Sequence, residues 1–579
     1  MLELGQFWRN TDLRKHVAVV DEKIAPTMIL ANGTYLNVFT KQWVEANIWI
    51  YNERIVYVGK EMPTNTENVE IVDCSNQYLV PGYIEPHAHP YQLYNPEQLA
   101  LHVAKFGTTV IMSDNLRLLS LLEKKKAFSI IENIQKMPVS MFWWGRYDSQ
   151  SMLQNEAEIF NTNDILSWIS HPTVVQGGEL TAWPKLLAGD DRLLYWIQET
   201  KRLRKRVEGH LPGASEKTLT KLKLLGVSGD HEAMSGEEVI RRLQLGYHVT
   251  LRYSSIRPDL PKILEELMAE SFSTFEQLMF TTDGATPTFY EYGMINICVQ
   301  IAIEKGVPLI EAYRMATYNV AKYYGLDDVV GSIAPGRIAH INILEAKDNP
   351  NPVSVLAKGQ WMLKDENQIQ QINQMNWEQY EIQNPFDWDI TVEDLQFSIP
   401  IGLKMENDVI MKPYPVAIDI TTSELPNNTA DAFLLLLDRH GKWRVNTVIH
   451  GFTKTLGALC SSYSATGDII LIGKKKYDMQ LAFRRMKEIG GGLVIVDDGQ
   501  VIFELPLEIN GVMSAKNFET IIEKSHQFQE ILQDAGYQYH DPIFCLLFLS
   551  STHLPFIRVT QKGIIDVLKL DIIVPANMR

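Results

Sequence analysis

The sequence of 579 residues has only four cysteines, at the widely separated positions Cys74, Cys298, Cys460 and Cys545. None belongs to a CxxC pair, so we expect neither a zinc ribbon nor a disulfide framework, and we predict that each cysteine is a small buried apolar residue. The chain also lacks an apolar stretch long enough to span a bilayer, and no apolar signal-peptide core is visible at its start. We therefore expect a cytoplasmic protein.

Positive charge is in deficit, because 54 basic residues stand against 70 acidic ones and the net charge is −16. This balance argues against nucleic acid or a membrane surface as a partner. One local basic run, KRLRKR at 201–206, is interpreted as the solvated end of a helix. The content of 45% hydrophobic and 21% charged residues is ordinary for a globular protein, and the length predicts two or three domains.

Short apolar runs alternate with helical patterns through the middle of the chain. Eight such runs are predicted to be strands: 78–84, 107–114, 137–145, 173–179, 206–210, 226–232, 248–255 and 277–284. Strand–helix alternation repeated eight times predicts an α/β protein with a (β/α)₈ barrel of the TIM type.

The segments before and after the predicted barrel have a different pattern. They are rich in short β-like runs and turn signals. ANG at 31–33 and YNER at 51–54 are predicted hairpin turns before the barrel, and DDG at 497–499 predicts another near the C-terminus. The expected organisation is as follows: an N-terminal β part over 1–77, the barrel over 78–330, a return to the first β part over 331–365, a linker over 366–395 and a C-terminal α+β domain over 396–579.

Residues that can bind metals follow five of the eight predicted strands. They are His87 and His89 after the first run, Glu179 after the fourth, His210 after the fifth, His231 after the sixth and Asp283 after the eighth. The C-terminal ends of the strands form the reactive face of a (β/α)₈ barrel, so these side chains are expected to meet. Imidazole and carboxylate suit zinc, manganese or iron, and six ligands suffice for two ions. We predict that Glu179 bridges them and that a water made acidic by both ions is the nucleophile.

These motifs resemble the metal-dependent amidohydrolase superfamily and, within it, the adenine deaminases. VPGYIEPHAHP at 80–90 resembles the first-strand motif of the superfamily, and GSIAPGRIAHINIL at 331–344 resembles its turn back into a small β-sandwich. The adenine deaminases are matched by GGE at 177–179, GDHEA at 229–233 and MQLAFRRMKEIGGGLVIVDDG at 479–499. The resemblance covers most of the chain and implies a discontinuous β-sandwich beside the barrel.

The resemblance also implies an activity, namely hydrolytic deamination of adenine to hypoxanthine and ammonia in purine salvage. It assigns the six residues above as ligands of two divalent metal ions, with Mn²⁺ expected and Fe²⁺ or Zn²⁺ as alternatives. Asp283 is the expected proton carrier from water to the leaving amine, and Glu232 is a candidate for protonating a ring nitrogen. The expected partner is a small purine base, and we expect a homo-oligomer.

The chain departs from the family pattern at two places. The family usually has a TDDRHP-like run where this chain has TDGATP at 282–287, and a His-Asp-Ser-His stretch where this chain has SYSATGD at 462–468. These changes bear on substrate contacts, so deamination of a different amino-purine, or hydrolysis of a cyclic amide or an N-acyl group, stays open as an alternative. A non-catalytic metal protein is a third hypothesis, although mixed histidine and carboxylate ligands argue against a closed structural site.

Overall fold

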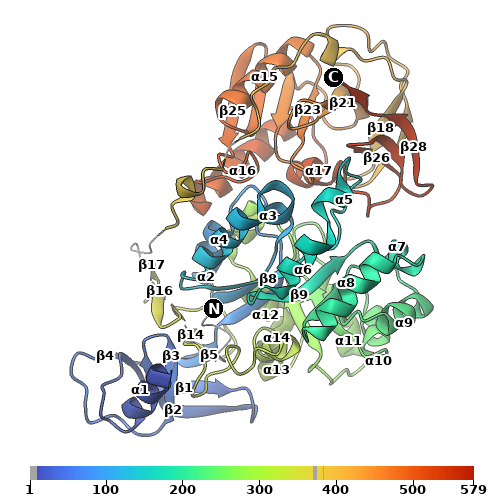
Figure 1. Ribbon diagram of the computed structural model, residues 1–579. Helices are drawn as coiled ribbons and strands as arrows, with labels where there is room; N and C mark the ends of the chain where they lie inside the picture. Colours follow the sequence, from blue (N-terminus) through green and yellow to red (C-terminus); the bar gives the residue numbers. More distant parts are fainter. Residues whose placement is uncertain (1–9, 369–373, 383) are drawn as a thin grey trace.

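The computed structural model describes residues 10–368, 374–382 and 384–579. The first nine residues, together with 369–373 and 383 of the predicted linker, lie outside the described residues. Figure 1 shows three parts along the chain: a β part in blue at the bottom, a central barrel, and a C-terminal part in orange and red at the top.

The centre of the molecule is an eight-stranded parallel sheet whose strands follow one another in chain order, which confirms the predicted barrel. Its strands are β6 (Tyr83–Ala88), β7 (Thr108–Asp114), β8 (Ser140–Gly145), β9 (Val174–Leu180), β10 (Arg206–Gly209), β11 (Gly229–Asp230), β12 (His248–Arg252) and β13 (Leu278–Thr281). A parallel bridge between Ala88 and Asp283 joins the end of the first strand to the segment after the last one. Almost every residue of these strands is buried, as expected for parallel strands covered by helices.

A helix follows each barrel strand. The eight are α2 (Pro96–Ala104), α4 (Lys124–Ile134), α6 (Thr162–Ser170), α8 (Asp191–Arg202), α9 (Glu216–Leu224), α10 (Gly236–Gln244), α11 (Leu260–Ala269) and α12 (Ile295–Glu304). Side chains at the N-terminal ends of several of them accept a backbone N–H of the first turn, such as Asn95, Asp190 and Ser235. Further helical pieces are α3 (Leu116–Leu121), α5 (Glu156–Ile159), α7 (Trp183–Leu187), η1 (Pro287–Tyr292), α13 (Leu309–Met315) and α14 (Tyr318–Tyr324).

Segments from both sides of the barrel in the sequence form one nine-stranded sheet. Its strands are β1 (Met28–Asn37), β2 (Gln42–Tyr51), β3 (Arg54–Gly59), β4 (Glu70–Asp73), β5 (Tyr78–Pro81), β14 (Ile341–Leu344), β15 (Ser354–Ala357), β16 (Gln360–Lys364) and β17 (Asn367–Gln368). Strand β14 pairs antiparallel with β5, so the returning segment joins the N-terminal strands. Helix α1 (Asn10–Val20) precedes them.

Two local predictions in this region were wrong. The run 78–84 is not one barrel strand, because the chain leaves the first sheet after Pro81 and enters the barrel at Tyr83. ANG at 31–33 is not a turn, because strand β1 passes through it with a shift in register between Leu30 and Gly33. Asn32 has a φ of 61°, which identifies a bulge and explains why the sequence resembles a turn. The YNER turn is confirmed between β2 and β3.

The C-terminal part combines a nine-stranded sheet with helices and a small three-stranded sheet. The larger sheet contains β18 (Ile401–Met405), β19 (Met411–Pro415), β20 (Asp431–Leu437), β21 (Trp443–His450), β22 (Ala458–Ser461), β23 (Ile469–Gly473), β24 (Gly492–Asp497), β25 (Gln500–Pro506) and β29 (Asn577–Met578). The DDG hairpin is confirmed between β24 and β25. The remaining elements are η2 (Trp377–Tyr380), η3 (Glu393–Leu395), α15 (Lys476–Glu488), α16 (Phe518–Asp534), α17 (Pro542–Phe548), β26 (Ile557–Thr560), β27 (Gly563–Asp566) and β28 (Asp571–Pro575).

All four cysteines are buried and free, as predicted. Within the part of the chain that the structure describes, no helix combines the length and the apolar character needed to cross a membrane.

Candidate metal centre at the barrel mouth

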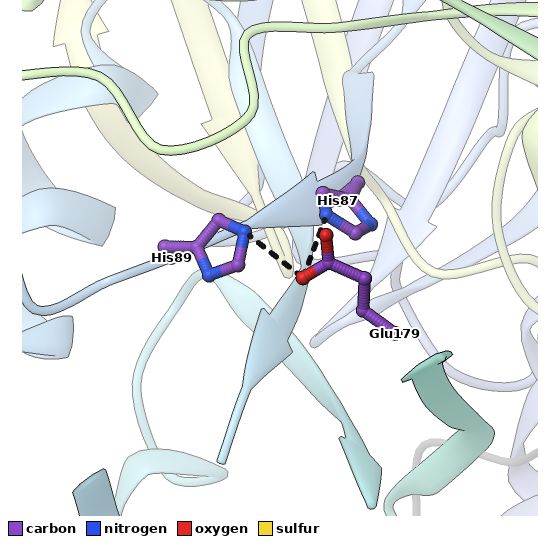
Figure 2. Close-up of side chains that lie close together, drawn as sticks. All are labelled: His87, His89 and Glu179. Atoms are coloured by element: carbon purple, nitrogen blue, oxygen red, sulfur yellow. Dashed lines mark ion pairs between the residues drawn. The ribbon is translucent and has the colours of Figure 1, made fainter. Parts of the chain in front are cut away.

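The predicted ligands meet at one end of the barrel because they stand at or just beyond the C-terminal ends of its strands. His87 is the penultimate residue of β6, and His89 comes directly after the end of that strand. Glu179 lies near the end of β9, while His210 and His231 come directly after β10 and β11. A strand side chain alternates between faces, so His87 and His89 point to the same region, as Figure 2 shows.

The two carboxylate oxygens of Glu179 face two different pairs of histidines. Oε2 lies 3.9 Å from His87 Nε2 and 3.7 Å from His89 Nε2, and Figure 2 marks both contacts. Oε1 lies 2.7 Å from His210 Nδ1 and 3.4 Å from His231 Nε2. Glu179 therefore lies between two separate donor sets, each within reach of one metal ion.

Asp283 follows the last barrel strand and reaches the histidines of the first donor set from the segment that bridges Ala88. Its Oδ1 lies 3.0 Å from His89 Nε2 and 3.8 Å from His87 Nε2. Its backbone has a φ of 55°, and its N–H donates to the Thr281 hydroxyl. A left-handed conformation is uncommon for a residue other than glycine and occurs often at functional sites.

The buried nitrogens at this site fit bound cations. Both ring nitrogens of His87 and Nδ1 of His231 are buried and have no hydrogen-bond partner among the residues that the structure describes. Two sets of donor atoms, from His87, His89 and Glu179 and from Glu179, His210 and His231, each lie within 4.8 Å of one another. Unpartnered buried polar atoms are costly, and a divalent metal that accepts these nitrogen lone pairs removes the cost.

The charges around the site keep its carboxylates ionised and His87 neutral. Burial raises the pKa of Glu179, but the charge of Arg146 and the contact with His210 outweigh it and hold that pKa well below the usual range. Burial likewise opposes ionisation of Asp283, whose pKa is nevertheless held well below its usual value by a hydrogen bond from His89 and by the charge of Arg252. For His87, burial and neighbouring His231 lower the pKa, which favours the neutral form that binds metals.

Glu232 is held between two arginines. Its Oε1 is 2.5 Å from Arg252 Nη1 and its Oε2 is 2.6 Å from Arg257 Nη1, while Oε1 also lies 3.5 Å from His210 Nδ1. Burial raises the pKa of Glu232, but Arg252 and its other cationic neighbours lower it strongly. Glu232 is therefore a carboxylate before any reaction and must take up a proton before it can donate one.

Sequence reasoning missed the residues that hold these ligands in place. Glu85 is fully buried and accepts hydrogen bonds from His87 N (2.8 Å), Thr281 Oγ1 (2.6 Å), and both the N and Oγ1 of Thr282 (2.8 Å each). It therefore links the segment that carries His87 to the one that carries Asp283. Glu85 was visible within the motif at 80–90, but nothing in the sequence showed which strand it would contact.

A second missed group comprises Arg146 and Asp114, which contact the predicted ligands Glu179 and His89. The Arg146 side chain is fully buried, and its Nη2 lies 2.7 Å from Asp114 Oδ2 and 3.0 Å from Glu179 Oε2. Asp114 Oδ2 also lies 2.9 Å from His89 Nδ1. Metal-binding histidines commonly bond a carboxylate through their other nitrogen, which fixes the ring orientation. Asp114 has this position relative to His89.

Four of the six predicted ligands line the floor of a cavity of about 470 Å³ that the C-terminal part covers. The polar floor includes His89, Glu179, His210, Glu232 and Asp283. The side of the cavity that comes from the C-terminal part is largely apolar and includes Val409, Leu547, Phe548, Leu554 and Pro555. The barrel mouth is thus enclosed by residues more than a hundred positions away in the sequence.

The two departures from the family pattern meet at Gln92 in the wall of this cavity. A Cβ added at Gly284 would lie 3.1 Å from Gln92 Nε2 and 3.1 Å from His89 Cδ2, so a larger side chain is crowded there. The Tyr463 hydroxyl donates to Gln92 Oε1. Positions 284 and 463 therefore both lie against Gln92, beside His89.

Comparison with known proteins agrees with this architecture. Residues 78–362 match the amidohydrolase family, and residues 410–571 match the adenine deaminase C-terminal domain. A protein of Oceanobacillus iheyensis named "Putative adenine deaminase" is 57% identical over 579 residues, covering 100% of both chains. A Bacillus subtilis protein with the same description is 50% identical over 99% of both chains. The "Adenine deaminase" of Leuconostoc citreum is 25% identical over 93% of this chain and 97% of that protein.

Proposed function

The chain belongs to the adenine deaminase family of amidohydrolases, and from this premise we propose that it catalyses hydrolytic deamination of adenine to hypoxanthine and ammonia. The observation that carries the proposal is the position of Glu179 between two pairs of histidines, with Asp283 against the first pair. The mixed histidine and carboxylate donor set is that of a catalytic centre rather than of a closed structural zinc site.

The six residues His87, His89, Glu179, His210, His231 and Asp283 would hold two divalent metal ions, with Mn²⁺ as our first candidate and Fe²⁺ or Zn²⁺ as alternatives. When bound, such ions supply a hydroxide nucleophile at neutral pH. In related hydrolases of cyclic amides a carboxylated lysine often occupies the bridging position. Glu179 would take that position here, which favours the deaminase branch.

The carboxylates of this chain carry the protons of the reaction. The oxygen of water forms a bond to C6 of adenine, and the bond from C6 to the amine breaks. Asp283 accepts one proton of the water and passes it to the leaving amine, which departs as ammonia. Glu232, ionised between its two arginines, takes up the other proton and delivers it to ring nitrogen N1, so that hypoxanthine is released as the neutral lactam.

The crowded wall at Gln92 favours a second candidate, deamination of a different amino-purine. Gly284 and Tyr463 differ from the family pattern, and both contact Gln92 beside the cavity. Gln92 and Gly284 line the cavity, and the buried Tyr463 contacts this wall through Gln92. A changed substituent on the purine would therefore leave the hydrolytic chemistry as proposed.

The deciding experiment is incubation of manganese-loaded protein with adenine, following both ammonia and hypoxanthine. Stoichiometric formation of the two products establishes the activity, and about two metal ions per chain accompany it. No turnover of adenine together with turnover of another amino-purine supports the second candidate. Turnover of a cyclic amide or an N-acyl compound instead would replace both. A role in purine salvage, a cytoplasmic location and a homo-oligomeric state remain part of the proposal.

A further inference from the structure

A histidine from the C-terminal part lies next to one of the proposed metal ligands. It lines the side of the cavity that the C-terminal part forms, which is called the roof below. His553 lies between α17 and β26, and its ring centroid is 5.3 Å from that of His210 with an angle of 82° between the ring planes. It lines the same cavity as Glu232 and Arg252. Most of its neighbours on the roof are apolar, with Asn407 and Ser551 as polar exceptions, and the Phe548 ring meets it edge-on at 5.8 Å.

The position of His553 is fixed by hydrogen bonds to the barrel. Thr552 N donates to Gln150 O at 2.8 Å, and Ser151 Oγ donates to Ser550 O at 2.7 Å. Gln150 in turn donates from its side-chain amide to Glu179 Oε2 at 3.2 Å. One residue of the barrel thus contacts both the bridging carboxylate and the segment that carries His553. These hydrogen bonds fix the position of His553 relative to Glu179.

The hydrogen bonding of the ring leaves one nitrogen for a ligand. Among the described residues, Nδ1 of His553 is enclosed by protein atoms and has no hydrogen-bond partner. A proton on Nδ1 would be a buried donor without an acceptor, so the neutral ring places its proton on Nε2, where the ring borders the cavity. Among roof residues that are largely apolar, His553 thus presents an N–H donor to the cavity beside His210.

We propose that the Nε2–H group of His553 donates a hydrogen bond to an acceptor nitrogen of the substrate's heterocyclic ring, so that the C-terminal part selects the substrate. This inference rests on the proposed function and deepens it. An apolar roof covers the faces of a planar heterocycle, and one donor above a polar floor fixes which edge of the ring points to the metals. A substrate without a ring acceptor at that place loses this contact.

The test compares His553→Leu, which removes the donor, with His553→Gln, whose amide nitrogen comes close to the position of Nε2. The control is His540→Leu, because His540 is an exposed histidine of the same part of the chain. Each full-length, manganese-loaded protein is assayed for the dissociation constant of hypoxanthine by calorimetry, for kcat and KM with adenine, and for its melting temperature. We expect His553→Leu to raise both the dissociation constant and KM about tenfold. His553→Gln and His540→Leu stay within about threefold of the wild type.

The outcomes separate this inference from the proposed function. If the wild type converts adenine and His553→Leu binds and reacts as the wild type does, the inference is overturned while the function stands. If His553→Leu and His553→Gln lose binding equally and both melt at lower temperature, His553 is structural and the inference is also overturned. If the wild type neither binds hypoxanthine nor converts adenine, the proposed function fails first and the inference fails with it.

Discussion

At the scale of single residues, most of the chemistry depends on carboxylates whose ionisation is fixed by cations. Arg146 pairs with Asp114 and Glu179, while Arg252 lies between Glu232 and Asp283. Each arginine is buried, and its charge offsets the cost of burying its acidic neighbours. The acids can therefore stay ionised deep in the barrel, where they are able to accept protons.

The role of Asp283 is tested by Asp283→Asn, which keeps an oxygen near His89 but removes the proton acceptor. We expect metal content close to that of the wild type and a kcat lower by about 10³-fold, within the range for loss of a general acid–base group. Metal analysis and steady-state kinetics on the same preparation check this expectation. Turnover retained in the metal-loaded variant would contradict the assignment of Asp283 as the proton acceptor.

Tyr463 offers a test of the wall beside His89. Tyr463→Phe removes the hydroxyl that donates to Gln92 and keeps the buried ring. We expect a KM changed by about fivefold, because Gln92 loses one hydrogen bond while the six proposed metal ligands are untouched. The metal content should not change. A variant that loses metal but keeps its KM would show that this wall supports the ligands instead of the substrate.

At the scale of elements, the metal centre depends on how the segments after neighbouring strands are joined. Asp230, which precedes His231, accepts from Leu211 N at 2.9 Å, and Leu211 follows His210. Arg242 of α10 donates to Asp230 Oδ2 at 2.6 Å and to Leu211 O at 3.0 Å. A buried ion pair thus connects the segments that carry two of the proposed ligands to the helix that follows them.

Arg242→Leu is expected to lower the free energy of unfolding by about 3–5 kcal/mol, because it leaves Asp230 charged, buried and without its partner. Denaturant unfolding of the metal-free protein measures the loss. The matched control is Arg241→Leu, since Arg241 pairs with the exposed Glu237 on the same helix and such pairs contribute about 1 kcal/mol or less. Equal losses in the two variants would contradict the role given to the buried pair.

At the scale of the whole molecule, the barrel and the C-terminal part share one hydrophobic core. The loop that follows His89 contacts residues 513–518: Ser514 N donates to Leu93 O at 2.7 Å, and Tyr94 packs against Phe518 with ring centroids 4.9 Å apart. Leu93, Tyr94 and Phe518 belong to a single cluster of buried apolar residues that extends through both parts. We therefore expect the two parts to unfold together.

Metal removal is expected to destabilise this joint unit. With free metal at 100 times its dissociation constant, each site adds about 2.7 kcal/mol to the free energy of unfolding. Chelation should lower the temperature of one common calorimetric transition, and added Mn²⁺ should restore it. Glu179→Gln is the control, because a variant without the bridging carboxylate should respond little to the chelator. Two transitions, of which only the first shifts, would show that the parts unfold separately.

The sequence was sufficient for the parts of the fold that have a strong local signal. Alternation of apolar runs and helices predicted the eight barrel strands, and DDG predicted the hairpin between β24 and β25. Local signals failed where distant partners decide the outcome. The bulge at Asn32 resembles a turn in sequence, and only its pairing with β2 distinguishes the two. The run at 78–84 is divided because β5 pairs with β14, more than 250 residues away.

The sequence by itself determined which residue types stand at the strand ends, because the periodicity of the chain and the spacing of His87, His89 and Glu179 are local properties. Only the tertiary structure decided how these residues share their partners: the division of the Glu179 oxygens between two histidine pairs, the attachment of Glu85 to the segment of Asp283, and the placement of His553 over His210. Such contacts join segments far apart in the chain. They depend on the closure of the barrel and on the packing of the C-terminal part against it, which no short stretch of sequence encodes.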